Sequence, residues 1–415
     1  MPPVELPAAV ECCLPAAHRV MARCDELAQL SSMADGIQRL YLSAEQQETN
    51  AVVSAWMQEV GLKTRIDAAG SLIGESAQSK STQPWLLLGS HLDTVPNAGR
   101  YDGILGVLLG IEAAHNCRDL PLNYEVIGFA EEEGVRFGTT LMTSRARAGS
   151  WDSAWWSLTD KQGETVAEAF NANGLDPDDI ASACPAKNLL AYLEVHIEQG
   201  PILQDADLPL GVVDSIAAAQ RFTITIEGRA GHAGTVPMSM RQDALVGAAH
   251  CILLAQRLSQ ELGMTATVGK VQAHPGAVNV ISGRVELSLD ARSVDEAMLE
   301  RFVESYATAA RALLTKENLS MQMTTIHQAG AAHCAGHIQE AMHTALSRLP
   351  LASTTISSGA GHDAMAMQDV CDIGMLFVRC KDGISHNPAE SVTVEDVAWA
   401  LCALQFTIEE IAAKL

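Results

Sequence analysis

Hydrophobic residues recur along the chain with two periods, one typical of strands and the other of helices. Short apolar runs followed by polar loops predict four strands, at Trp85–Leu88, Tyr124–Ala130, Ala191–Ile197 and Gly374–Val378. Longer stretches with helical spacing predict helices, among them Ala44–Val60 and Gly103–His115. Strands that alternate with helices indicate an α/β fold with a mostly parallel sheet joined by crossover helices.

The stretch from residue 212 to residue 328 has a different order of elements. It predicts strand, helix, two strands, helix and closing strand, at Phe222–Glu227, Arg241–Leu262, Thr265–Val271, Arg284–Ala291, Val294–Leu314 and Ser320–Ile326. This βαββαβ order resembles the split βαβ plan. We therefore expect an α+β domain over residues 212–328, inserted into a domain made of residues 1–211 and 329–415. The 415 residues suffice for two domains, because single cores rarely grow beyond about 250–300 residues.

Composition and charge narrow the choice of partner. Apolar residues make up 48% of the chain and charged residues 19%, which suits a folded globular protein. The formal net charge of −23 repels nucleic-acid phosphates and anionic lipids, so we expect neither a nucleic-acid nor a membrane partner. The longest apolar run, Gly103–Ile111, is shorter than the roughly 20 residues of a membrane span.

The cysteines and the first residues point to a cellular location. The segment that contains Glu5 and Glu11 lacks a basic start, so we do not expect it to be a secretory signal. Ten cysteines are scattered without a C-x-x-C pair, which indicates reduced thiols and a cytoplasmic location.

Each of the four predicted strands ends at a loop with a group of polar residues, and ligands of open α/β sheets bind at such ends. The first loop, G-S-H-L-D-T-V-P-N-A-G-R-Y-D-G, carries His91 and Asp102, both good metal ligands. Asp93 would accept a hydrogen bond from the second nitrogen of the His91 ring and so fix its tautomer. The alternative for this loop is a capping aspartate beside a surface histidine.

The other three loops add carboxylates and imidazoles. In A-E-E-E-G-V-R-F, residues 130–137, three adjacent carboxylates need a cation or a proton unless the loop is solvated. In E-V-H-I-E-Q-G, alternation would place Glu194, His196 and Glu198 on one strand face, although a core histidine is the alternative. In G-I-S-H-N-P-A-E, His386 is either a ligand or a surface histidine.

Together these residues predict a site for two metal ions. His91, Asp102, one glutamate of the triplet, His196 and His386 supply nitrogen and oxygen donors, and such donors suit zinc, manganese or cobalt. A second histidine pair, His333 and His337, lies four residues apart on a predicted helix. It lacks the glutamate of the zincin motif, so we do not expect zinc there.

These stretches resemble the M20-type metallo-amidohydrolases, in the branch of N-carbamoyl-L-amino-acid hydrolases, β-ureidopropionases and allantoate amidohydrolases. The resemblance extends from about Glu45 to the C-terminus and includes A-G-H-A-G-T-V-P-M, P-G-A-V-N-V-I-S-G and S-G-A-G-H-D-A-M. Within the branch, M-S-M-R-Q-D-A-L and G-M-L-F-V-R-C look most like allantoate amidohydrolases. The resemblance implies a di-metal catalytic domain and an inserted domain that mediates dimerisation.

The resemblance also implies how the metal ions are held. His91 and His386 would be terminal ligands of different ions, and Asp102 would bridge the two. Glu133 and His196 would complete the set around two divalent ions per subunit, zinc or manganese.

Further residues would act on the substrate. Glu132 would be the general base, and His232 would stabilise charge on the scissile carbonyl oxygen. The residues implied in substrate binding are Gln220, His232, Asn279, Arg292 and Gly361. The sequence departs from the family at Val236, where threonine is frequent, and near Gln220, where a usual glycine is missing. For Arg292 a surface pair with a neighbouring aspartate is an equal alternative.

The resemblance predicts hydrolysis of a ureido C–N bond of allantoate, which yields ammonia, carbon dioxide and ureidoglycine. The substrate is then a small ureido carboxylate, and the active site of a homodimer would be completed by the partner subunit. The alternatives are an N-carbamoyl-L-amino-acid hydrolase or β-ureidopropionase, a metallo-aminopeptidase or dipeptidase, and a metal-stabilised binding protein without activity. The last is disfavoured, because every expected ligand and the base are present.

Overall fold

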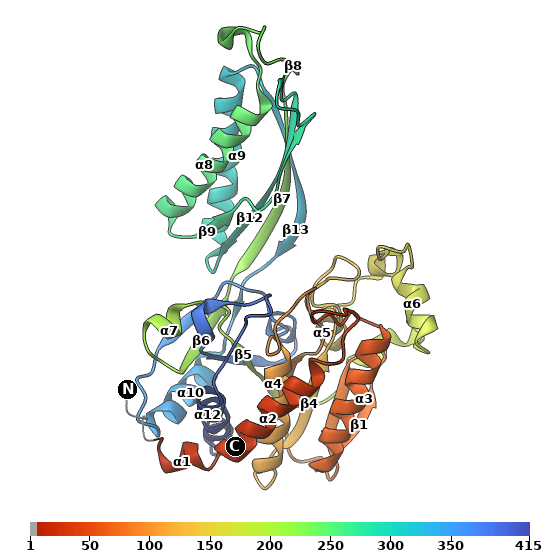
Figure 1. The fold of residues 1–415 in the computed structure, drawn as a ribbon. Coiled ribbons are helices and arrows are strands. Elements are labelled where there is room, and N and C mark those ends of the chain that lie inside the picture. The colour runs from red at the N-terminus through yellow and green to blue at the C-terminus, as the bar shows by residue number, and fades with distance from the viewer. Residues whose placement is uncertain (1–5) are drawn as a thin grey trace. The chain divides into compact units, whose positions relative to one another are not determined.

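The computed structural model describes residues 6–415. Residues 1–5, which include Glu5 of the segment not expected to be a secretory signal, lie outside the described residues. The chain divides into two compact units (Figure 1). The discontinuous unit comprises Met1–Asp214 and His333–Leu415, and the inserted unit comprises Ser215–Ala332. The boundaries predicted from the sequence lay at residues 212 and 328.

The central sheet of the discontinuous unit has the strand order β1-β2-β4-β3-β5-β16-β6-β14, with β15 paired to β6. The strands are β1 (Leu62–Ile66), β2 (Leu72–Ser76), β3 (Trp85–His91), β4 (Asn123–Phe129), β5 (Leu189–Ile197), β6 (Leu210–Ile216), β14 (Ala332–His333), β15 (Thr355–Ser358) and β16 (Asp372–Val378). The middle strands β4, β3, β5 and β16 are parallel, which confirms the predicted fold class. The strands β1, β2 and β6, which were not predicted, pair antiparallel at either side.

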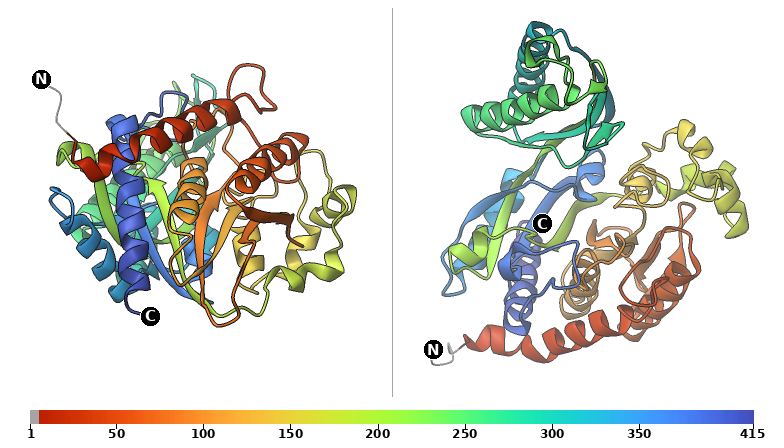
Figure 2. Two further views of the ribbon diagram at one scale, coloured as in Figure 1. Left: turned by 90° about the horizontal axis from the view of Figure 1, so that it is seen from below. Right: turned by 45° about the horizontal axis from the view of Figure 1, so that its top comes forward.

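The helices of this unit include some that pack on the sheet and others that pack mainly on helices or loops. They are α1 (Ala8–Glu11), α2 (Leu14–Leu27), α3 (Ala44–Glu59), α4 (Ile104–Asn116), α5 (Met142–Arg147), α6 (Val166–Ala172), α7 (Ile202–Asp205), α10 (Gly336–Ser347), α11 (Ala364–Met367) and α12 (Val394–Ala412). Four short 3-10 helices occur in the chain, at Ser153–Ser157, Pro177–Ala183, Met238–Met240 and Lys381–Gly383. Helices α2, α4 and α12 contact one another and share one hydrophobic core with the middle strands (Figure 2). Helix α3 packs on β1 and β2.

The middle strands are apolar because both faces are buried, as parallel sheets require. Helix α4 lies very close to β5, and a Cβ atom at Gly106 would come within 2.2 Å of the Val195 carbonyl oxygen. Strand β3 runs three residues further than predicted and ends at His91, since Gly89 and Ser90 are buried in register with β4.

The inserted unit is an antiparallel sheet with two helices on one face. Its elements are β7 (Ala218–Glu227), β8 (Gly231–His232), α8 (Ala244–Leu262), β9 (Thr265–Thr267), β10 (Val271–His274), β11 (Val280–Ile281), β12 (Arg284–Ser293), α9 (Glu296–Lys316) and β13 (Ser320–Ala329). The sheet order is β10-β12-β7-β13, with β9 also on β12, and β8 pairs with β11 apart from it. Helices α8 and α9 pack together and share a core with β7 and β12.

One strand predicted in this unit is wrong. The stretch Thr265–Val271 is divided between β9 and β10, because the chain bulges out around Gly269. The bulge is held by the Ser288 hydroxyl, which accepts a hydrogen bond from the Lys270 N–H at 2.9 Å.

Within residues 6–415, none of the helices combines the length and the apolar character that crossing a membrane requires. All ten cysteines are free thiols.

Candidate metal centre

The parallel strands bring the predicted metal ligands to one edge of the sheet. His91 is the last residue of β3, His196 is the last but one of β5, and Glu133 follows β4 after three residues. His386 lies in the loop after β16. Because β4, β3, β5 and β16 are neighbours, their carboxyl ends meet, as expected for the ligand site of an open α/β sheet.

The ligand atoms form two overlapping triads. One contains His91, Asp102 and His196, and the other contains Asp102, Glu133 and His386, with all ligand atoms of a triad within 4.8 Å of one another. Asp102 Oδ1 lies 3.1 Å from His196 Nε2 and 3.6 Å from His91 Nε2. Asp102 Oδ2 lies 3.2 Å from His386 Nε2. The shared carboxylate therefore faces imidazoles on both sides.

The surroundings of Asp102 fit a cation. Its Oδ1 atom is buried and accepts no well-aligned hydrogen bond among residues 6–415, although His196 Nε2 lies 3.1 Å away. The next residue, Gly103, has φ +73°, and a Cβ atom there would lie 2.5 Å from His91 Nε2. Only glycine therefore leaves the His91 Nε2 atom open.

The carboxylates are crowded and need positive charge. Burial, together with the charges of Glu133 and Asp363, raises the pKa of Glu132 well above its ordinary value. Burial and the charge of Asp102 raise the pKa of Glu133 to about 7. The contact with Asp102 raises the pKa of His386 to about 8. A divalent ion would relieve this crowding by replacing bound protons.

Asp93 contacts the site differently from the prediction. The Nδ1 atom of His91 lies 3.0 Å from the backbone carbonyl oxygen of Asp93 and 3.6 Å from its carboxylate. The Asp93 carboxylate instead accepts hydrogen bonds from the backbone N–H groups of Glu132 and Glu133, at 3.3 and 3.2 Å. Its side chain thus holds the turn that presents the two glutamates.

Glu198 is not beside His196 in the way the alternation predicted. Strand β5 ends at Ile197, and the Glu198 carboxylate accepts hydrogen bonds from the N–H groups of Ile202 and Leu203 at the start of α7. Glu194 does face the site, where its carboxylate accepts from the Ser90 hydroxyl at 2.8 Å. It forms a further possible ligand group with His196 and His362.

Sequence reasoning missed the residues that orient Asp102. Glu390 is buried and accepts hydrogen bonds from the backbone N–H groups of Tyr101 and Asp102, at 2.9 and 3.2 Å. The Ser385 hydroxyl contacts both Asp102 Oδ2 and Glu390, and the Gln199 amide donates to Asp102 Oδ2 at 2.9 Å. Glu390 lies four residues after His386, so the same stretch supplies a ligand and its support.

Gly361, predicted from the resemblance, is exposed and directly precedes two buried residues, His362 and Asp363. The His362 ring lies edge-on to His196, with centroids 4.4 Å apart, and its Nε2 lies 2.8 Å from the Ser358 hydroxyl. Burial and the charge of His196 hold the pKa of His362 well below its ordinary value, so this ring is neutral.

The remaining predicted residues lie in the inserted unit. His232 and Asn279 are close together, because β8 pairs with β11 and the Ala233 N–H donates to the Asn279 carbonyl oxygen. Both side chains are exposed. The His232 Nδ1 atom accepts a hydrogen bond from the Gly234 N–H at 3.0 Å, so the neutral ring carries its proton on Nε2.

Gln220 and Arg292 lie on the adjacent strands β7 and β12. The Arg292 guanidinium makes a two-pronged contact with Asp290, at 2.8 and 2.9 Å, which is the aspartate pair that the sequence left as an alternative. Arg221 also pairs with Asp290, at 2.9 Å.

The histidine pair rejected from the sequence is not on one helix. His333 belongs to β14, whereas α10 begins at Gly336. The exposed His337 lies 3.7 Å from Asp372.

Comparison with known proteins agrees with this geometry. Residues 87–410 match the Peptidase family M20/M25/M40. The allantoate deiminase of Arabidopsis thaliana is 36% identical, over 93% of this chain and 81% of that protein. The N-carbamoyl-L-amino acid amidohydrolase of Geobacillus stearothermophilus is 35% identical, over 95% of this chain and 98% of its own. The structure resembles a hydantoinase/carbamoylase family amidase from Burkholderia multivorans, with a TM-score of 0.87 and 31% identity. The match covers 95% of this chain and 98% of that chain.

Proposed function

We propose, because this chain belongs to the Peptidase family M20/M25/M40, that it hydrolyses a ureido C–N bond of allantoate. The enzyme is a hydrolase of non-peptide C–N bonds, and its expected products are ammonia, carbon dioxide and ureidoglycine. The observation that carries the proposal is the pair of ligand triads that share Asp102 next to Glu132. The similarity to allantoate deiminases supports the substrate.

The residues that would hold two divalent ions, zinc or manganese, are those of the two triads. His91, Asp102 and His196 would hold one ion, and Asp102, Glu133 and His386 the other. When bound, such ions supply Lewis acidity, which polarises the ureido carbonyl group and acidifies water. Asp102 belongs to both triads, so it would help to hold both ions.

Glu132 would act as the general base. Its side chain is buried, and it forms a group with His91 and Glu133 within 4.8 Å. It takes a proton from the attacking water and delivers it to the leaving nitrogen, for which a carboxyl group with a raised pKa is suited.

Residues of the inserted unit, from the same or the partner subunit, would bind the substrate. The Nε2–H of His232 would donate to the carbonyl oxygen as negative charge develops there. Arg292 and Asn279 would hold the substrate carboxylate, since a guanidinium group binds a carboxylate with two parallel hydrogen bonds. Gln220 and Gly361 would complete the pocket.

The second candidate substrate is an N-carbamoyl-L-amino acid. It also presents a ureido group and a carboxylate, so the same residues would bind and hydrolyse it. The amidohydrolases named for such substrates are as similar to this chain as the allantoate deiminases, at 35–36% identity. This similarity supports an N-carbamoyl-L-amino acid as the alternative substrate.

The enzyme would be a cytoplasmic homodimer. Ten free cysteines support a reducing compartment. Exposed apolar side chains of the inserted unit support an interface there, namely Met238, Met240, Leu245, Val246 and Leu253. Sedimentation would test the dimer, and substitution of Leu253 by a charged residue should yield monomers.

Ammonia release from allantoate and from N-carbamoyl-L-alanine tests the proposed reaction, with the enzyme first chelated and then resupplied with manganese or zinc. Metal-dependent release from allantoate alone is expected. Release only from the carbamoyl amino acid would keep the mechanism and replace the substrate. No release from either, with both metal ions bound, would overturn the proposal.

A further inference from the structure

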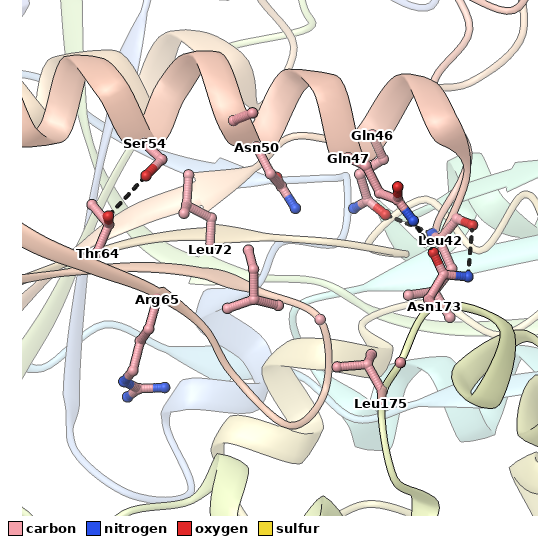
Figure 3. Close-up of a pocket in the computed structure, with 14 residues that line it drawn as sticks. Leu42, Gln46, Gln47, Asn50, Ser54, Thr64, Arg65, Leu72, Asn173 and Leu175 are labelled. Carbon is pink, nitrogen blue, oxygen red and sulfur yellow. Dashed lines mark hydrogen bonds between the residues drawn. The ribbon is translucent and has the colours of Figure 1, made fainter.

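A groove of about 590 Å³ lies between helix α3, strand β1 and residues 173–175. No candidate metal ligand lines it. Figure 3 shows that α3 forms one wall, with Asn50 in the middle and Leu72 and Leu175 opposite. The volume lies within the range of about 300–1,000 Å³ that small-molecule sites occupy.

Asn50 is the polar group in the groove that lacks a partner. Its side chain points from α3 into the groove (Figure 3), yet the residue is only 8% exposed. Its Oδ1 atom is buried and has no hydrogen-bond partner among residues 6–415. An unsatisfied buried acceptor lowers the stability of the folded protein. Because Oδ1 is closed off, the amide nitrogen is the Asn50 group that can donate to a ligand in the groove.

Other polar groups of the groove make hydrogen bonds or ion pairs within the protein. The Gln46 amide oxygen accepts from the Leu42 N–H at 2.6 Å, and the Asn173 amide donates to the Leu42 carbonyl oxygen at 3.2 Å. Gln47 donates to Asn173 Oδ1. Arg65, at one end, is paired with Glu75 at 3.1 Å. The groove thus offers one uncommitted amide above an apolar floor, which suits a neutral ligand with an amide group.

The groove is connected to the turn that carries the general base. The Leu42 carbonyl oxygen, which accepts from Asn173, also accepts from the Arg136 guanidinium at 3.2 Å. Arg136 follows Glu133 by three residues and also donates to the Tyr41 carbonyl oxygen at 2.8 Å. A ligand that orders this wall would therefore act on the segment that holds the glutamates.

We propose that this groove binds a small neutral molecule with an amide or cyclic ureide group, and that its occupancy changes turnover at the metal centre. The ligand presents a C=O group to the Asn50 amide nitrogen and lays its apolar face on Leu72 and Leu175.

Titration calorimetry of the metal-loaded full chain with hydantoin, a neutral cyclic ureide, tests the binding. Ala51 is exposed and lines the groove, so Ala51→Trp should fill it and weaken binding about tenfold or more. Glu48→Trp adds the same ring to α3 outside the groove and should bind like the wild type. Equal affinity of both variants, or no heat up to about 10 mM hydantoin, would overturn the site.

Asn50→Leu separates binding from folding. It removes the unsatisfied amide, so thermal unfolding should occur at the same or a higher temperature, while hydantoin binding falls about tenfold or more. A lower unfolding temperature with unchanged binding would contradict the role of Asn50. To test whether occupancy of the groove changes turnover, the reaction rate is measured with and without hydantoin. The rate of the wild type and of Glu48→Trp should change, and an unchanged rate at saturating hydantoin would overturn this effect. Because heat is measured without substrate, failure of the proposed reaction would not affect the binding result.

Discussion

The two units carry their candidate functional residues in opposite ways. In the discontinuous unit, His91, Asp102 and His196 are buried and contact one another, the two histidines at the ends of β3 and β5 and Asp102 in the loop after β3. In the inserted unit, His232 and Asn279 are exposed on the short β8–β11 pair. Buried charges must be matched by neighbours within the fold, whereas exposed groups need only be oriented. This contrast fits the proposed roles, a bound ion in the first region and an exchanging substrate in the second.

The largest effect should come from the base inside the buried cluster. Glu132→Gln keeps the size and the hydrogen-bonding oxygen but cannot take a proton, so turnover should fall about 100–10,000-fold. Metal content by atomic absorption should stay the same. The matched control is Glu131→Gln, because Glu131 serves the fold by accepting a hydrogen bond from the Phe137 N–H at 2.7 Å. A nearly active Glu132→Gln variant would contradict the role.

The exposed region should give the next largest effect. His232→Ala removes the Nε2–H donor, so kcat should fall about 100–1,000-fold while metal content is unchanged. His232→Gln retains an N–H donor and should recover part of the rate. The control is His250→Ala, since His250 lies on α8 and pairs with Glu317. If His232→Ala raised KM and left kcat intact, the residue would bind the ground state and not the developing charge.

The same contrast explains how much of the molecule the sequence predicts. Apolar runs that end in His or Glu clusters predict strand ends, and parallel neighbours bring those ends together, so the five candidate metal ligands meet. The role of Asp93 was mistaken, because spacing cannot show whether a backbone or a side-chain oxygen meets an imidazole. Glu390 was missed, since its effect on Asp102 depends on a contact across 288 residues of chain. The split of Thr265–Val271 depends on a bulge that no hydrophobic period encodes.

A smaller effect should follow from the support of the buried cluster. The two carboxylate oxygens of Asp93 each accept a hydrogen bond from one backbone N–H group, of Glu132 or of Glu133. In Asp93→Asn one oxygen becomes an NH2 group, which cannot accept, so one of the two hydrogen bonds is lost. The turn should loosen and metal affinity should fall about 10–100-fold, as for other residues that orient ligands. Competition with a fluorescent chelator would measure it. Asp152→Asn, which changes only an exposed 3-10 helix cap, is the control. An unchanged metal affinity would mean that the turn keeps its conformation without the Asp93 carboxylate.

The last prediction concerns the protons that a metal ion must displace. In the metal-free protein the pKa of Glu133 is about 7 and that of His386 about 8, both raised. At a pH below its pKa each of these side chains holds a proton that competes with the metal ion. The affinity for the metal ion should therefore rise as the pH increases from about 6 to 8. The gain is about tenfold per pH unit for each proton displaced. Calorimetry in buffers of different ionisation enthalpy would count the released protons. In Glu133→Gln one proton fewer should be released, whereas an affinity independent of pH would show that the carboxylates are ionised before the ion binds.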